Sequence, residues 1–257
     1  MTRCWRRCSG SAVEGERRRH EADRGHALAG KSTLNRLEPT DAESASAGER
    51  YKKVAADAEA IDALLVDFFI ESHPRPPERI VLDVDATDEP LHGEQEGRFF
   101  HGYYRHHCYL PLYIFCGRYP LCARLRHCRQ DEAAGSCGEL ERIVARIRRH
   151  WPEVQIVLRA DSGFCRDWLM SWCERHGVDY VLGIARNARL EAMLGEAMEE
   201  ARREHEQSGR AARRFETFRY RTRESWSCER QVVGKAEYLA KGPNPRSIVT
   251  SLGLDDD

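Results

Sequence analysis

Two short segments that each end in aspartate constrain the fold of this chain most strongly. Residues 79–85 read Arg-Ile-Val-Leu-Asp-Val-Asp, and their apolar positions alternate as in a strand. Asp83 and Asp85 are two positions apart, so both should point to the same face. Residues 154–158 form a second, mainly apolar run, typical of a buried central strand, and Asp161 follows it. An α/β sheet usually builds its site at the carboxyl ends of its strands.

The surrounding pattern predicts three strands followed by alternating helices and strands. The first three strands should be antiparallel, and the helix-connected ones should place Asp85 and Asp161 on neighbouring strands. We expect strands at residues 79–85, 103–115, 119–126, 154–158 and 180–184, with a loop at 86–101, and helices at 136–150, 167–176 and 190–206. This order predicts an α/β fold of the ribonuclease-H-like kind, a mixed sheet flanked by helices.

The two ends of the chain differ from this core. A helical pattern from Glu49 carries five apolar residues on one face, Ile61, Leu64, Leu65, Phe68 and Phe69, and stops at the prolines after His73. Residues 215–223, 230–239 and 247–252 look extended. We therefore expect a partly helical N-terminal region at 1–77, a catalytic core at 78–214 and a β-rich insertion at 215–257.

Composition limits the possible classes of protein. With 257 residues the chain can form one sizeable core and a smaller attachment. No run of about 18 apolar residues occurs, and no apolar stretch follows the first arginines, so we expect a cytoplasmic protein without a membrane span. The ten cysteines include no Cys-x-x-Cys pair, which favours reduced thiols over structural zinc, even beside His106 and His107.

Charge suggests nucleic acid only locally. The chain has 41 Lys and Arg residues against 42 Asp and Glu residues, so its net charge gives no indication. Two arginine clusters could neutralise phosphates, although a solvated face explains them equally well. They comprise Arg142, Arg146, Arg148 and Arg149, and then Arg210, Arg213, Arg214, Arg219, Arg221 and Arg223.

Asp85 and Asp161 are candidates for metal-dependent chemistry on phosphodiesters. Carboxylates are the ligands that Mg²⁺ prefers, and a cation offsets the repulsion between two neighbouring acids. Two metal ions can activate the attacking oxygen and stabilise the leaving one in an in-line displacement. Asp161 could instead cap the helix that follows through Ser162 and Gly163.

Residues 25–32 also match the phosphate-loop pattern G-x-x-x-x-G-K-[ST]. That loop requires a buried strand immediately before it, which aims its amides at the phosphates. Residues 17–24 are mostly charged and cannot form such a strand. Nucleotide hydrolysis is therefore not expected.

Two blocks resemble those of DDE transposases from bacterial insertion sequences. Residues 82–88, Leu-Asp-Val-Asp-Ala-Thr-Asp, with residues 92–104, are similar to the first catalytic block, and Leu-Arg-Ala-Asp-Ser-Gly-Phe at 158–164 is similar to the second. The resemblance implies that Asp85 and Asp161 bind Mg²⁺ or Mn²⁺, with Asp83 as a neighbour. It also implies that the protein cleaves and joins DNA strands at element ends. Its partner would then be DNA and not a membrane, and it would form an oligomer when DNA is bound. The arginines expected near DNA are Arg159, Arg186, Arg219, Arg221 and Arg223.

The chain departs from that family at its third acid. The family's glutamate stands in a Tyr-x-x-Arg-x-x-x-Glu block on a helix after the β-rich insertion. Here Tyr220 and Arg223 are followed by Ser227 in the place of the glutamate, and the chain ends at Asp257. We expect a truncated copy that lacks the third carboxylate and cleaves DNA poorly or not at all.

Three alternatives stay open at this stage. The chain could be a non-catalytic DNA-binding remnant, which would use the arginine clusters alone. It could be a stand-alone nuclease that takes Glu224 or Glu229 as its last acid. It could also fail to fold stably, if a missing final helix leaves apolar surface exposed.

Overall fold

One large sheet holds both acid-bearing strands. The computed structural model describes residues 57–253, and the chain divides into two units, Met1–Ile61 and Asp62–Asp257. The elements below belong to the second unit, apart from the first turn of its first helix. The phosphate-loop pattern at 25–32 and the helical pattern before residue 57 lie outside the described residues.

The central strands of the sheet run in the order β6-β5-β1-β7-β8. β1 pairs antiparallel with β5, and β5 with β6, whereas β1–β7 and β7–β8 are parallel. The strands are β1 (Arg79–Ala86), β5 (Leu112–Cys116), β6 (Tyr119–Arg124), β7 (Gln155–Ala160) and β8 (Asp179–Ile184). Three antiparallel strands followed by helix-connected parallel ones confirm the predicted ribonuclease-H-like arrangement of a mixed sheet flanked by helices.

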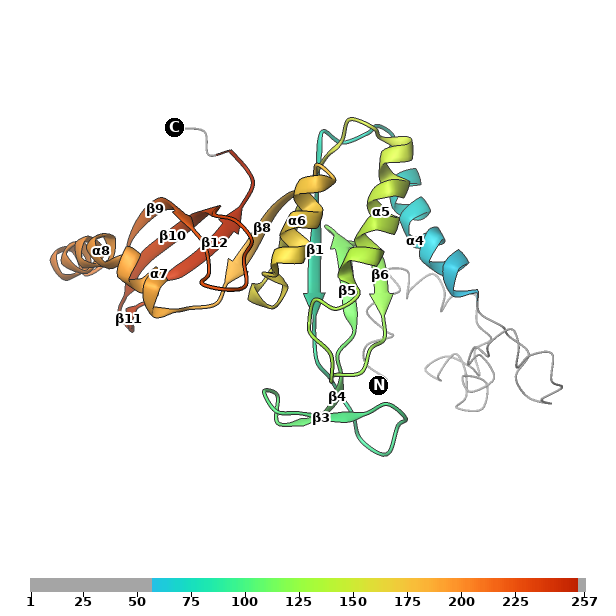
Figure 1. Ribbon diagram of the computed structural model, residues 1–257, viewed down its shortest axis with the longest axis horizontal. Helices are drawn as coiled ribbons and strands as arrows, with labels where there is room; N and C mark the ends of the chain where they lie inside the picture. The colour runs from blue at the N-terminus through green and yellow to red at the C-terminus, as the bar shows by residue number, and fades with distance from the viewer. Residues whose placement is uncertain (1–56, 254–257) are drawn as a thin grey trace, which may run out of the picture. The chain divides into compact units, whose positions relative to one another are not determined.

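Three helices share a core with these strands (Figure 1): α4 (Ala58–Glu71), α5 (Ser136–His150) and α6 (Asp167–Arg175). α5 buries the apolar stripe that the sequence predicted. In α4 the predicted apolar face is only partly buried, because Leu64 and Phe68 are 63% and 62% exposed, whereas Phe69 is buried together with Val66 and Ile70. None of the helices between residues 57 and 253 is long and apolar enough to cross a membrane.

The segment between β1 and β5 was predicted as a loop and one strand, and it differs from both. It forms a separate three-stranded sheet of β2 (Glu89–Pro90), β3 (Phe99–His101) and β4 (His106–Tyr109), in the order β2-β4-β3. The strand expected at 103–115 is interrupted at Leu110 and Pro111, and proline cannot donate a ladder hydrogen bond. β4 and β5 therefore belong to different sheets.

The last elements extend the large sheet beyond β8. They are α7 (Ala188–Met193), α8 (Gly195–Ser208), β9 (Ala212–Tyr220), β10 (Arg230–Leu239), β11 (Gly242–Pro243) and β12 (Arg246–Thr250). β12 pairs antiparallel with β8 and with β10, and β10 also pairs with β9 (Figure 1). The single helix expected at 190–206 is broken at Leu194. The side chain of Leu194 packs over Gly234 of β10, where an added Cβ would lie 2.5 Å from Leu194 Cδ2.

Candidate active site

Asp85 and Asp161 stand at the ends of two adjacent parallel strands. The register of β1 and β7 aligns Asp83 with Arg159 and Val84 with Ala160. Asp85 follows Val84 within β1, and Asp161 follows Ala160 directly after the end of β7. Neighbouring strands lie about 4.8 Å apart, so the backbones of the two aspartates are close to one another at the carboxyl edge of the sheet.

The backbone also directs the two aspartates to one face of the sheet. Ile80, Leu82 and Val84 are buried, whereas Asp83 is half-buried and Asp85 exposed, so β1 buries one face and presents its acids on the other. Arg159 lies on the acid face, because its Nη2 donates to Asp83 Oδ2 at 2.9 Å. Asp161 follows Arg159 by two residues in an extended conformation and returns to that face.

Asp83 differs from its neighbours because it is neutralised. Its carboxylate accepts two hydrogen bonds from the Arg159 guanidinium, which raises the pKa of Arg159. A bidentate arginine occupies the oxygens that a cation would need. Asp83 therefore stays a predicted neighbour of the candidate site, with both of its oxygens bonded to Arg159.

Asp85 and Asp161 have only neutral partners within residues 57–253. Asp85 Oδ1 accepts from the Ala86 amide at 2.9 Å, and its Oδ2 accepts from Thr87 Oγ1 at 2.6 Å. Asp161 Oδ1 accepts from the Gly163 amide at 2.9 Å, so the predicted cap exists, on a short 3₁₀ helix (Ser162–Phe164). Capping uses one oxygen of Asp161 and leaves the other available.

A third carboxylate, Glu132, lies against Asp161, and sequence reasoning missed it. Glu132 belongs to the loop between β6 and α5. A Cβ added to Gly163 would lie 1.8 Å from Glu132 Oε2 and 3.1 Å from Asp161 Oδ1, so both oxygens border the same Gly163 hydrogen. Burial raises the pKa of Glu132, and the negative charge of Asp161 raises it further. A lone acid in a loop carries no sequence signal for this position.

The donor set suits a hard divalent cation but is incomplete. No group of three or more His, Cys, Asp and Glu side chains in residues 57–253 is close enough together to hold a metal ion. Asp85 and Asp161 nonetheless offer carboxylate oxygens that no arginine or lysine of the described residues neutralises. Oxygen ligands of this kind are what Mg²⁺ and Mn²⁺ require.

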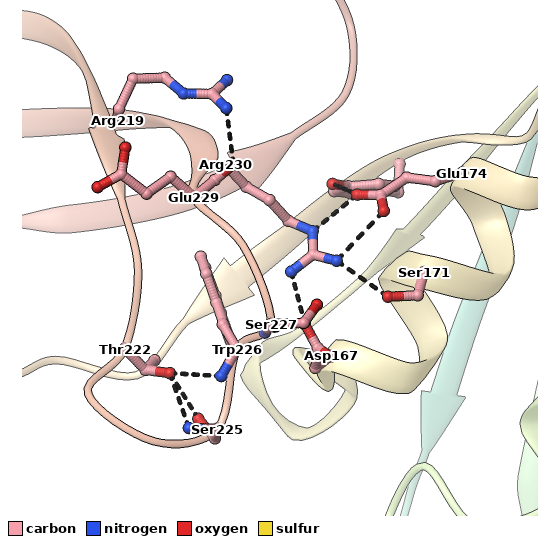
Figure 2. Close-up of polar contacts among 11 residues, drawn as sticks. Asp167, Ser171, Glu174, Arg219, Thr222, Ser225, Trp226, Ser227, Glu229 and Arg230 are labelled. Carbon is pink, nitrogen blue, oxygen red and sulfur yellow. Dashed lines mark hydrogen bonds and ion pairs between the residues drawn. The ribbon is translucent and has the colours of Figure 1, made fainter.

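A second group of acids lies on α6 and is built around a buried arginine (Figure 2). Arg230, 3% exposed, donates to Asp167 Oδ1 at 2.7 Å, to Glu174 Oε1 at 2.7 Å and to Ser171 Oγ at 3.1 Å. Ser227 donates its amide and its hydroxyl to Asp167 Oδ1. These bonds tie the start of β10 to α6. We call this group the Arg230 cluster.

The electrostatics of the Arg230 cluster follow from its hydrogen bonds. Burial alone would raise the pKa of Asp167 and of Glu174. Hydrogen bonds from Ser227 and Arg230 outweigh burial at Asp167, and those from Arg230 and Tyr180 do so at Glu174, so both pKa values lie below the usual range. Burial would lower the pKa of Arg230, but the two carboxylates raise it.

The arginines expected near DNA occupy different settings. Arg159 binds Asp83, Arg186 donates to Asn244 Oδ1 at 3.1 Å, and Arg219 donates to the Glu229 carbonyl at 2.6 Å. Arg221 and Arg223 are exposed in the loop between β9 and β10. That loop is fixed at its base by Thr222, whose hydroxyl accepts from the amides of Ser225 and Trp226 (Figure 2).

Most of the first arginine cluster is structural. Arg142 contacts Glu139 and the carbonyls of Asp62 and Leu121, Arg146 pairs with Asp67, and Arg148 donates to two carbonyls after α6. These side chains hold α5 against the elements that carry their partners. The phosphate-binding alternative is therefore weak for these three residues.

The Tyr-x-x-Arg-x-x-x segment is not helical here. Tyr220 is the last residue of β9, and Arg223, Glu224, Ser227 and Glu229 lie in the loop before β10. The buried ring of Tyr220 packs edge-on against Trp226, at 5.7 Å between centroids. This segment therefore forms the connection between β9 and β10.

Comparison with known proteins places the chain in a family. Residues 12–257 match the family described as Transposase DDE domain group 1. A search of the curated proteins gave no match. Among solved structures, the chain is similar to the cryo-EM structure of the piggyBac transposase synaptic complex with hairpin DNA, with a TM-score of 0.40 and 12% identity. That similarity covers 71% of this chain and 35% of the other.

Proposed function

Because the chain belongs to the family of transposase DDE domains, group 1, we propose that it acts on DNA by metal-dependent phosphoryl transfer. The observation that supports this proposal is the parallel pairing of β1 with β7, which places the carboxyl ends of the two strands side by side, where Asp85 and Asp161 occur. The reaction would be strand cleavage by water and joining of the resulting 3′-hydroxyl to target DNA. DNA in a synaptic complex, which the name of the piggyBac structure states for that protein, would be the partner here too.

In this proposal Asp85 and Asp161 hold Mg²⁺ or Mn²⁺ at the carboxyl edge of the sheet. A bound divalent cation supplies Lewis-acid polarisation of the phosphate and lowers the pKa of a nucleophilic water. Thr87 and the Gly163 amide hold the carboxylates in orientation through the bonds described above. Arg159 keeps Asp83 neutralised, so that the two free carboxylates define the site.

The test is cleavage of duplex DNA taken from the sequences that flank the gene, with Mg²⁺ or Mn²⁺. We expect only slow nicking by the wild-type chain, because Ser227 stands at the position of the family's glutamate, and a further loss of about 100-fold in rate for Asp85→Asn and for Asp161→Asn. Asp83→Asn, on the same strand and face, is the matched control and should retain most activity. Nicking that persists unchanged in both Asp→Asn variants would refute the catalytic assignment.

A second candidate function is DNA binding without catalysis. It is favoured by the absence, within residues 57–253, of a complete three-ligand group and of a helical glutamate after Arg223. It predicts salt-dependent DNA binding that Asp85→Ala and Asp161→Ala leave unchanged, with no nicking under any metal condition. Weaker binding by Arg221→Ala and Arg223→Ala would locate the interface at the exposed loop.

A further inference from the structure

The hairpin of β3 and β4 exposes large aromatic side chains. Tyr103, at its tip, is 84% exposed, and Phe100, in β3, is 59% exposed. Phe99 and Cys108 of the same two strands pack into the core, so the small sheet has a buried face and an outer face. Exposed apolar side chains that occur in groups, unlike scattered single ones, indicate an interaction surface.

The exposed ring of Tyr103 is supported by other rings. It packs edge-on against Tyr104, with 5.1 Å between the ring centroids. Tyr104 is half-buried and contacts the rings of His101, at 4.8 Å, and His106, at 6.0 Å. His106 in turn lies 2.7 Å from Asp88 Oδ2 through its Nε2. A ring on such a support can stack on a ligand with little further loss of side-chain entropy.

Arg105 places a positive charge at the same tip, in an unfavourable backbone conformation. Its φ is 59°, and between residues 57 and 253 it is the one residue other than glycine with a positive φ. Its amide donates to the His101 carbonyl at 2.8 Å, but its exposed guanidinium forms no hydrogen bond or ion pair with the described residues. Glycine adopts this conformation without cost, so an arginine here indicates a role for its charge.

The hairpin belongs to a long stretch of sequence without acids. No Asp or Glu occurs in residues 97–130. The same stretch contains Arg98, Arg105, Arg118, Arg124, Arg126 and Arg129. Arg129 lies near the base of the hairpin, with its Cζ 4.1 Å from the centroid of the Phe99 ring. A partner of this surface is therefore expected to be negatively charged, and DNA offers both phosphates for the arginines and planar bases for the exposed rings.

The small sheet lies at the carboxyl end of β1, next to the candidate site (Figure 1). Burial raises the pKa of Tyr104, and the negative charges of Glu132, Asp88 and Asp161 raise it further. The side chain that supports Tyr103 is therefore close to the carboxylates at this edge of the large sheet. DNA bound at the hairpin tip would lie beside the carboxyl ends of β1 and β7.

From these observations, and resting on the proposed function, we propose that the hairpin tip binds unpaired nucleotides of the DNA substrate beside the candidate site. The ring of Tyr103 stacks on a base, and the guanidinium of Arg105 binds a neighbouring phosphate. Bases inside a duplex already stack on both of their faces, so the ring requires a base that is unpaired. Aromatic rings combined with positive charge are a common way for proteins to hold single-stranded DNA.

The measurement is fluorescence anisotropy of the full chain with a labelled single-stranded oligonucleotide, and with the blunt duplex of the same sequence, in EDTA. We expect Tyr103→Ala to weaken binding of the single strand by about tenfold and to leave binding of the blunt duplex unchanged. Tyr103→Phe keeps the ring and should bind as the wild type does. Phe68→Ala, which removes an exposed ring of α4, is the matched control and should also leave binding unchanged.

Arg105→Gly tests the charge separately from the fold. Glycine relieves the left-handed conformation, so urea unfolding should show equal or higher stability. Affinity for the single strand should nonetheless fall by about threefold, and the slope of log affinity against log salt should weaken by about 0.7. Arg105→Lys should restore most of the affinity. Unchanged affinity in both Tyr103→Ala and Arg105→Gly, or an equal loss for the blunt duplex, would overturn the inference.

The nicking assay separates this inference from the proposed function. If Asp85→Asn and Asp161→Asn stop nicking while Tyr103→Ala binds single-stranded DNA as the wild type does, the hairpin assignment is wrong and the proposed function stands. If Tyr103→Ala loses binding while both aspartate variants nick DNA at the wild-type rate, the hairpin assignment stands and the catalytic assignment is wrong. A wild-type chain that binds no single-stranded DNA would refute the hairpin assignment alone.

Discussion

The molecule contains two groups of acids that differ in how their charge is balanced. In the Arg230 cluster, Asp167 and Glu174 surround a buried guanidinium that bonds to both. At the edge of β1 and β7, Asp85 and Asp161 accept only from amides and a hydroxyl, and Glu132 beside them has no partner among the described residues. Acids used for structure are thus paired with arginine within the chain, whereas those at the edge of β1 and β7 have no cationic partner among the described residues, and under the proposed function a divalent cation would balance their charge.

Removing one charge from each group should therefore have opposite effects on stability. Arg230→Met leaves two carboxylates without their partner, and we expect a loss of about 3 kcal/mol in the free energy of unfolding. Asp85→Asn and Asp161→Asn remove uncompensated charge and should leave metal-free stability unchanged or slightly higher. Urea unfolding without metal compares them, and a similar destabilisation by all three variants would remove the distinction.

Adding a divalent cation should increase the difference in stability between variants of the two groups of acids. We expect 5 mM Mn²⁺ to raise the Tm of the wild type and of Arg230→Met by several degrees, since ligand that binds only the folded state stabilises it. Asp161→Asn should show no such rise. Differential scanning fluorimetry measures this, with Ca²⁺-free buffer and EDTA as the reference. An equal rise in Asp161→Asn would place the bound ion elsewhere.

The sequence predicted that two acid-bearing strands are neighbours in the sheet, but it did not show which of the acids are paired with an arginine. Alternation along β1 and the apolar run before Asp161 were enough to predict neighbouring acid-bearing strands, because side-chain direction in a strand follows from spacing alone. Glu132 was missed because a loop has no periodicity, and its approach to Asp161 depends on Gly163 and on the bonds of Arg126. Arg230 was missed since its partners are 56 and 63 residues away in sequence.

Long-range packing also explains the errors in the elements. The exposed side of α4 carries Leu64 and Phe68, which the helical pattern alone could not distinguish from the buried Val66 and Phe69. The interruption between β4 and β5 could have been found, because Pro111 was visible in the predicted strand. The break at Leu194 had no such signal, because the residue against which Leu194 packs, Gly234, lies in a strand 40 residues later.

The free energy of unfolding should depend on pH because the Arg230 cluster contains two carboxylates with lowered pKa values. The folded pKa values of Asp167 and Glu174 lie below their ordinary values of 3.8 and 4.5. This stabilisation is therefore complete above about pH 5 and is lost as the pH falls through the lowered values. The difference in unfolding free energy between the wild type and Arg230→Met should shrink below pH 4. A constant difference from pH 7 to pH 3 would contradict this origin.

The smallest effect on stability should come from changing Asp83, which lies beside the candidate site but is paired with an arginine. Asp83 shares a strand and a face with Asp85 but is paired with Arg159, and this pair is 36% and 62% exposed. Exposed ion pairs contribute little, so Asp83→Asn should cost no more than about 1 kcal/mol in urea unfolding. Its Mn²⁺ affinity should change less than threefold, because Arg159 already excludes Asp83 from the cation. If Asp83→Asn weakened Mn²⁺ binding as strongly as Asp85→Asn, pairing with arginine would no longer distinguish structural acids from metal-binding ones.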